Sequence, residues 1–446
     1  MFKNKNLSSG AKYISINRPD LMSISMVIFI KVGSINELDD EKGMSHFLEH
    51  MLFKGSSKYK TPLEITEKLD SLGAVYNAFT DKNMTAYHIK VSQTYCHSAF
   101  DVLVDLVTKS LLKEKDMIME QQVVIEEFNQ MMDNPVRSLL ESTLQVVFQG
   151  QDLQHPIIGY LDNIKSYTNK SLKNYYNKFY NKSNMTIAIC GNINQKLEKQ
   201  VYKHFGKPKK TKKIENPKLD CCDVLGYPQT IFNFRGIPKK FKIKQDFKGF
   251  VPIVLDKRKS QQSHILISYK IPGIYNNSKW LFVAIKQYLA GTMSSRLFQI
   301  LREKWGLVYT VSIDILQYDD CGAFCIYAGT ETKNCKQVVQ LILKEMNDLA
   351  SKPIPRKELL KILKYIRGNL TLENDDSMNL AQYYGIQSLY NINIQTIDDL
   401  VKNVYIPRKI TPGKILKLSK KYFHKKNMII SILGNHSMQE CKRFIQ

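Results

Sequence analysis

Three short segments of this chain recur about 240 residues later, in the same order. SNMTIAICGNINQ (183–195) recurs as KNMIISILGNHSM (426–438), GAVY (73–76) recurs as GLVY (306–309), and GMSHFLEH (43–50) has a degenerate copy in GTMSSRLF (291–298). Ordered repeats of this kind indicate that one structural unit is used twice. A chain of 446 residues is long enough for two such domains. We therefore predict homologous domains over 1–205 and 256–446, joined by a connector over 206–255.

Each half contains both strand and helix patterns. VIFIKV (27–32) and TIAIC (186–190) are apolar runs typical of buried strands, whereas FDVLVDLVTKSLL (100–112) has helical periodicity. Strands and long helices mixed in this way favour an α+β fold. We expect each half to be a mostly antiparallel sheet with helices packed on one face.

The segment GMSHFLEHMLF (43–53) reads as one amphipathic helix that carries two histidines and a glutamate. Positions i, i+3 and i+4 share a helix face, so His46, Glu49 and His50 point the same way. Two histidines one turn apart can bind one zinc ion, and a nearby carboxylate can take a proton from the attacking water. The spacing is the inverted zincin pattern. A catalytic zinc needs a third protein ligand, which this helix does not supply.

A second helix, predicted over 117–132, offers that ligand. At about 100° per residue, Glu120 and Glu127 lie within about 20° of each other on an apolar side of this helix, whereas Glu126 points away. A carboxylate in an apolar stripe is costly unless it is paired or bound to metal. We therefore predict that Glu127 binds the metal, that Glu120 is its outer hydrogen-bonding partner, and that Glu126 is a solvated charge.

At this point the chain resembles the pitrilysin-type zinc metallopeptidases. It is most similar to their half-length branch, which includes bacterial processing proteases and the beta subunit of the mitochondrial processing peptidase. The likeness is carried by GMSHFLEHMLFKGS (43–56), LDSLGAVYNAFTDKNMTAYHIKV (69–91), EQQVVIEEF (120–128), GTMSSRLFQILREKWGLVYTVS (291–312) and CGAFCIYAGT (321–330).

The resemblance implies a role for each matching residue and one Zn²⁺ per chain. The zinc ligands would be His46, His50 and Glu127, the general base Glu49, and the accessory acid Glu120. Arg302 and Tyr309 match a pair that the family uses at the substrate, where a guanidinium and a phenol can donate to a carbonyl or an oxyanion. Asn77, Ala78 and Phe79 match the edge strand that pairs with an extended peptide.

The implied activity is that of a zinc metalloendopeptidase acting on peptides or unfolded segments. A half-length chain resembles the branch that needs a partner. Because the zinc motif and the Arg302/Tyr309 pair occur in one sequence, we expect a homodimer in which this pair reaches the partner's zinc. A heterodimer is the alternative. A different reading of the same fold is a non-catalytic scaffold or a subunit of a processing complex.

The net charge of +24 is concentrated partly in KPKKTKKIENPK (207–218) and PKKFKIKQDFKGF (238–250). Such stretches can bind nucleic acid, so a nucleic-acid-associated factor is a second alternative. Basic and aromatic residues do not alternate here as in a recognised binding module, which favours a solvated connector and makes nucleic acid an unexpected partner.

Eight cysteines without a CxxC pair favour a reducing compartment, and we expect the cytoplasm. Residues 1–13 show no apolar core of a signal peptide and no long transit segment, so neither is expected. No apolar run reaches the roughly 20 residues that a membrane span needs.

Overall fold

The computed structural model describes residues 2–207, 232–233 and 251–445. The chain divides into two compact units. The first comprises Met1–Phe128, His155–Lys218 and Thr371–Ile397, and the second comprises Asn129–Gln154, Leu219–Leu370 and Asp398–Gln446. The expected basic connector, 206–255, lies for the most part outside the described residues, as do Cys221 and Cys222.

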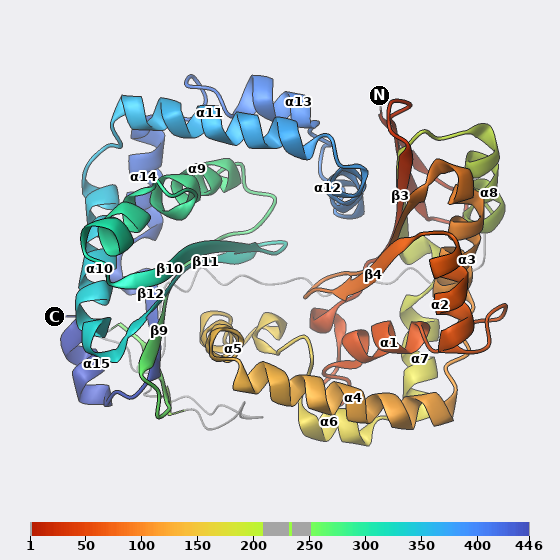
Figure 1. The fold of residues 1–446 in the computed structure, drawn as a ribbon, viewed down its shortest axis with the longest axis horizontal. Coiled ribbons are helices and arrows are strands. Elements are labelled where there is room, and N and C mark those ends of the chain that lie inside the picture. The colour runs from red at the N-terminus through yellow and green to blue at the C-terminus, as the bar shows by residue number, and fades with distance from the viewer. Residues whose placement is uncertain (1, 208–231, 234–250, 446) are drawn as a thin grey trace. The chain divides into compact units, whose positions relative to one another are not determined.

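The first unit contains a six-stranded sheet with the order β1-β2-β6-β3-β5-β4 (Figure 1). All neighbouring strands are antiparallel except β2 and β6, which are parallel. β4 therefore lies at one edge of this sheet. The strands are β1 (Phe2–Asn6), β2 (Lys12–Asn17), β3 (Ser23–Ile30), β4 (Val75–Thr80), β5 (Thr85–Ser92) and β6 (Met185–Gly191).

Helices cover both faces of this sheet. On one face α3 packs against β3 and β5, and on the other α12 packs against β2, β3 and β6 (Figure 1). The contact with α12 is close, because a Cβ added at Gly385 would lie 2.3 Å from the ring of Phe29. The helices of this unit are α1 (Met44–Leu52), α2 (Pro62–Ser71), α3 (Cys96–Thr108), α6 (Leu161–Ser166), α7 (Asn169–Phe179), α8 (Gln195–Phe205) and α12 (Ser377–Leu389).

The second unit repeats the strand order of the first. Its order, read from the corresponding edge, is β7-β8-β12-β9-β11-β10. Here β8 is parallel to both β7 and β12, and the other pairs are antiparallel. The strands are β7 (Phe232–Asn233), β8 (Ile253–Lys257), β9 (Gln262–Pro272), β10 (Val308–Gln317), β11 (Cys321–Glu331) and β12 (Met428–Gly434).

The second sheet also has helices on both faces, with α10 and α14 on one and α5 on the other (Figure 1). Two helices cross between the units: α4 (Glu114–Asp133) and α11 (Arg356–Glu373). The other helices are α5 (Pro135–Val147), α9 (Lys279–Ala290), α10 (Cys335–Ser351), α14 (Pro412–Tyr422) and α15 (Met438–Phe444), with the short α13 (Ile397–Asp399) and π-helical turns at Phe298–Lys304 and Leu400–Val404.

The predicted α+β architecture of two homologous, mostly antiparallel sheets is confirmed. The expectation that helices pack on one face of each sheet was wrong, because α12 and α5 cover the second face of the first and second sheet respectively. The strongest sequence repeat falls on equivalent strands, β6 and β12. The exchange of helices was not predicted: α5 lies in the first half of the sequence but packs on the second sheet, whereas α12 lies in the second half and packs on the first sheet. The boundaries predicted at 205 and 256 remain predictions. Among the described residues, no helix is long and apolar enough to cross a membrane.

Candidate metal centre

Helix α1 is fixed at its start by a buried carboxylate. Glu37 is 3% exposed, and its two oxygens accept the backbone N–H groups of Gly43 (2.7 Å) and Ser45 (2.8 Å). These N–H groups lie in the first turn, where a helix has no internal acceptors for them. Gly43 has φ 101°, a conformation that glycine adopts most readily. A Cβ at this position would also meet the carbonyl oxygen of Ile158 at 2.5 Å.

The apolar side of α1 determines where its motif points. Phe47, Leu48 and Met51 are fully buried, so the helix lies with this side against the first unit's core. His46, Glu49 and His50 occupy the remaining side and are partly exposed. The periodicity that predicted a shared face for these three residues therefore matches the observed burial.

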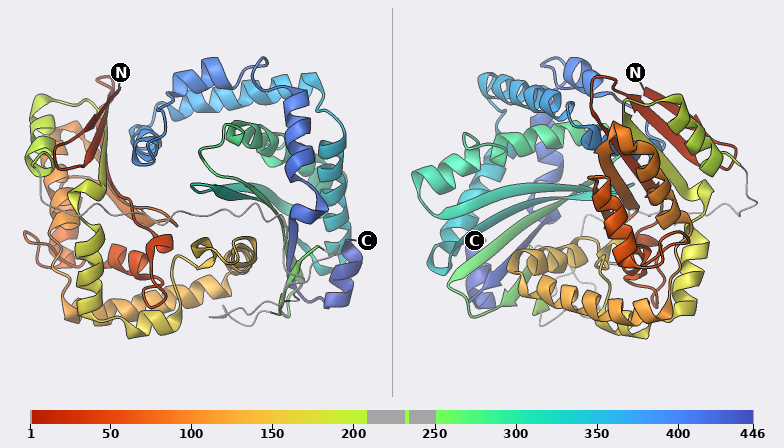
Figure 2. Two further views of the ribbon diagram at one scale, coloured as in Figure 1. Left: turned by 180° about the vertical axis from the view of Figure 1, so that it is seen from behind. Right: turned by 45° about the vertical axis from the view of Figure 1, so that its right-hand side comes forward.

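Helix α4 supplies the carboxylates opposite α1, and it lies beside α6 (Figure 2). Glu120 and Glu127 are two turns apart on α4, and both reach His50. Glu120 is 3% exposed and Glu127 lies closer to the surface, whereas Glu126 is exposed. The two carboxylates approach different nitrogens of the same imidazole, Nδ1 and Nε2 respectively.

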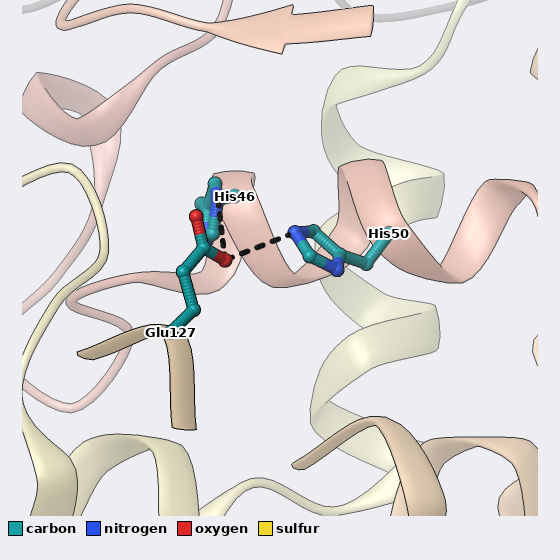
Figure 3. A group of neighbouring side chains, drawn as sticks. All are labelled: His46, His50 and Glu127. Carbon is teal, nitrogen blue, oxygen red and sulfur yellow. Dashed lines mark ion pairs between the residues drawn. The ribbon is translucent and has the colours of Figure 1, made fainter. Parts of the chain in front are cut away.

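His46, His50 and Glu127 converge on one point (Figure 3). One Glu127 oxygen lies 3.6 Å from Nε2 of His46 and 3.5 Å from Nε2 of His50. Zn–N and Zn–O bonds of about 2.0–2.2 Å place ligand atoms of a tetrahedral site about 3.3–3.5 Å apart. Two imidazoles and one carboxylate are also a zinc donor set. Both the spacing and the chemistry of these side chains therefore fit a zinc ion.

The protonation of the two histidines differs. Burial, reinforced by neighbouring His50, lowers the pKa of His46 to about 3, so its ring is neutral at pH 7 and has a free lone pair. Burial also acts to lower the pKa of His50, but the hydrogen bond with Glu120 and the charge of Glu127 outweigh it and raise that pKa. The surrounding carboxylates therefore interact more strongly with the imidazole of His50 than with that of His46.

Glu120 binds the outer nitrogen of His50. Its Oε1 is 2.8 Å from Nδ1 of His50, and its Oε2 is 2.5 Å from Nζ of Lys54. Burial raises the pKa of Glu120, but the hydrogen bonds from His50 and Lys54 more than compensate, so the pKa lies below its usual value. His46 has no equivalent support within the part of the chain that the structure describes, where its buried Nδ1 has no hydrogen-bond partner.

Glu49 lies on the same side of α1 and is held by a strand residue. The hydroxyl of Thr80, the last residue of β4, donates to Oε2 of Glu49 at 2.5 Å. Burial raises the pKa of Glu49, and the bond from Thr80 acts against that rise. A carboxyl group whose pKa is raised above its usual value is suited to accept a proton as a general base.

The predicted peptide-binding residues lie on β4, where the structure separates them by face. In the register of β4 and β5, Ala78 is opposite Tyr87, whereas Asn77 is opposite His88 and Phe79 is opposite Ala86. Because side chains alternate along a strand, Ala78 shares the face of Tyr87, and Asn77 and Phe79 point to the other face. Phe53, just after α1, packs against Tyr87, so Ala78 is on the α1 side.

Arg302 and Tyr309 belong to the second unit, where they contact each other. Arg302 lies in the π-helical turn and Tyr309 in β10, and the guanidinium is 5.2 Å from the centre of the phenol ring. The guanidinium also donates to the carbonyl oxygen of Tyr309 at 3.3 Å. Tyr309 is 83% exposed, so its hydroxyl is open to a binding partner. The sequence predicted this pair without predicting that its members stack.

Sequence reasoning missed three residues that contact the site: Glu37, Lys54 and Thr80. Lys54 has a local signal, because it is four residues after His50. Glu37 lies six residues before Gly43 and caps the start of α1 locally, but no periodic pattern points to it; Thr80 has no local signal, because it meets α1 through the tertiary fold.

Family models and similar proteins of known sequence both relate this chain to one family of peptidases. The protein-family model described as "Insulinase (Peptidase family M16)" matches residues 12–160, and the family model described as "Peptidase M16 inactive domain" matches residues 166–365. A Bacillus subtilis protein named as an uncharacterized zinc protease is 28% identical over 404 residues, covering 91% of this chain and 92% of its own. A Streptomyces coelicolor protein named in the same way is 26% identical over 444 residues, covering 99% and 91%.

Solved structures show the same fold. A protease from Helicobacter pylori superimposes with a TM-score of 0.82 at 21% identity, covering 97% of this chain and 99% of that one. The periplasmic protease PqqL from Escherichia coli gives 0.74 at 16% identity, and there this chain covers 48% of the larger protein. The chain belongs to the M16 peptidase family, and the family expected from the sequence is confirmed.

Proposed function

We propose that this protein is a zinc-dependent endopeptidase that hydrolyses peptides or unfolded segments. The observation that carries the proposal is the convergence of His46, His50 and Glu127 at ligand spacing, with Glu49 beside them on the same helix. The relatives named as zinc proteases support both the metal and the reaction class.

His46, His50 and Glu127 would hold one zinc ion per chain. A zinc ion bound there supplies a Lewis acid that polarises the scissile carbonyl and lowers the pKa of water. Glu49 takes the proton from the attacking water and later delivers it to the leaving amine. Thr80 keeps the Glu49 carboxylate in place through its hydroxyl. Glu120 orients His50 through Nδ1.

Substrate binding is proposed along β4. This strand is at the edge of its sheet, so one row of its backbone N–H and C=O groups is available to an extended peptide. Backbone pairing reads no particular side chain, which favours broad specificity. Asn77 and Phe79 would contact alternate residues of the peptide, and Ala78 would leave space on the α1 side.

The proposal is tested by digesting a peptide library with wild-type protein, with chelator-treated protein and with Glu49→Gln. Cleavage by the wild type alone is expected. Glu49→Gln should still bind zinc, because Glu49 is not one of the three converging residues. A wild type that contains zinc and cleaves no peptide would instead support a non-catalytic scaffold.

We further propose that Arg302 and Tyr309 grip the substrate or the oxyanion in a homodimer, each pair serving the partner's zinc. Mixing Glu49→Gln with Arg302→Ala tests this arrangement. In mixed dimers one of the two sites would regain an intact Glu49 and an intact Arg302, so about a quarter of wild-type activity is expected from random exchange in a symmetric dimer. No recovery after demonstrated subunit exchange would contradict the shared site, and a monomer in solution would contradict the dimer.

A further inference from the structure

Lys54 lies two residues beyond the end of α1 and reaches the second oxygen of Glu120. Its Nζ is 2.5 Å from Oε2, whereas His50 Nδ1 is 2.8 Å from Oε1. The side chain of Glu120 is only 4% exposed, and that of Lys54 is 29% exposed. A single buried carboxylate thus joins the imidazole of a proposed zinc ligand to an ammonium group at the edge of the site.

The geometry of Glu120 depends on both partners. A buried carboxylate is unfavourable unless its charge is paired and its oxygens are hydrogen-bonded. His50 can satisfy only one oxygen. Without Lys54, Oε2 would be buried without a hydrogen-bond donor. The Glu120 carboxylate would then be more stable if it turned toward water, which would take it away from His50.

We propose that Lys54 is a positioning residue for the zinc site: it holds Glu120 so that His50 keeps its Nδ1 hydrogen bond and directs Nε2 toward Glu127. This inference rests on the proposed zinc site. Nothing in the sequence motif or in the family comparison assigns the residue a role. His46 lacks any partner at Nδ1, so the chain Lys54–Glu120–His50 is the polar support that the described residues provide to the two imidazoles.

The test compares Lys54→Met and Lys54→Arg with a matched control, Lys90→Met. Lys90 donates to Asp376 at 2.6 Å in the same unit, and its side chain is 31% exposed, close to the 29% of Lys54, although Asp376 is more exposed than Glu120. Zinc affinity is measured by competition with a chromophoric chelator. Lys54→Met should weaken zinc binding about tenfold, the lower end of the range for outer-sphere partners of metal ligands. Lys54→Arg should recover most of the affinity, and Lys90→Met should match the wild type.

A double-mutant cycle separates this role from general stabilisation. Glu120→Gln should weaken zinc binding by itself, and adding Lys54→Met to it should cost little more, because Lys54 acts through Glu120. Fully additive losses, or an unchanged affinity in Lys54→Met, would overturn the inference. A wild type that binds no zinc would instead refute the proposed function. Thermal unfolding in chelator, where no zinc contributes, establishes that each variant is folded, and Lys54→Gln replaces Lys54→Met if the latter is not.

Discussion

Replacing Thr80 with valine removes the hydrogen bond from its hydroxyl to the Glu49 carboxylate. Valine keeps the branched shape of threonine, so the end of β4 should remain packed, while Oε2 of Glu49 loses the hydroxyl at 2.5 Å. A hydrogen bond to a charged group contributes about 1.5–3 kcal/mol. If that stabilisation acts on the reactive form of Glu49, kcat/KM falls by about 10- to 150-fold, since about 1.4 kcal/mol corresponds to a factor of ten.

The pH dependence has a defined sign. Burial raises the pKa of Glu49, and the Thr80 hydroxyl opposes this by favouring the ionised form. Removing the hydroxyl therefore raises the pKa further. Because the general base must be ionised to accept a proton, the acidic limb of the kcat/KM profile should move to higher pH, and the loss should be larger at pH 6 than at pH 8.

The assay is cleavage of an internally quenched fluorescent peptide between pH 5.5 and 8.5, with zinc content measured for every sample. Thr80→Ser keeps a hydroxyl and should stay near the wild type. Thr85→Val is a matched control: Thr85 is paired with Thr80 across the strands, but its hydroxyl donates to the carbonyl oxygen of Val32. It should lower stability and leave the pH profile unchanged. A Thr80→Val variant with wild-type kcat/KM and an unmoved acidic limb would refute the reasoning.

Three other perturbations follow from the structure. Saturating zinc should raise the thermal midpoint of the wild type, by an amount equivalent to about 2.7 kcal/mol at a hundredfold excess over Kd, and Glu127→Gln should abolish most of this shift in differential scanning fluorimetry. Asp105→Asn should lower the free energy of urea unfolding at pH 7, because Ser56, Ser57 and the Lys58 N–H all donate to this carboxylate. Burial acts to raise the pKa of Asp105, but these bonds outweigh burial and hold the pKa below its usual value. The stabilisation from the bonds is therefore present above about pH 4, the pKa in the unfolded chain, and is lost as pH falls through the pKa in the folded protein. Equal losses of unfolding free energy in Asp105→Asn at pH 3 and pH 7 would contradict this. Gly385→Ala should destabilise the fold by about 1–3 kcal/mol, since its Cβ would overlap the ring of Phe29, and an unchanged midpoint in urea would show that α12 is not packed as described.

Much of the site could be predicted because helical periodicity is a local property. The spacing of His46, Glu49 and His50 places them on one face of α1, and the two-turn separation of Glu120 and Glu127 does the same on α4. The internal repeat likewise predicted two equivalent sheets, and the structure shows them with matching strand orders. These conclusions need only the residue order and the geometry of a single element.

What the sequence alone determined is therefore which residues share a face and which family the chain resembles. The tertiary structure decided which faces meet: Thr80 reaches Glu49 from a strand 31 residues away, Lys54 and His50 take opposite oxygens of Glu120, and α12 packs on a sheet whose strands come from the other end of the chain. Contacts between distant segments depend on how whole elements pack, and residue spacing within one helix or strand carries no information about that packing.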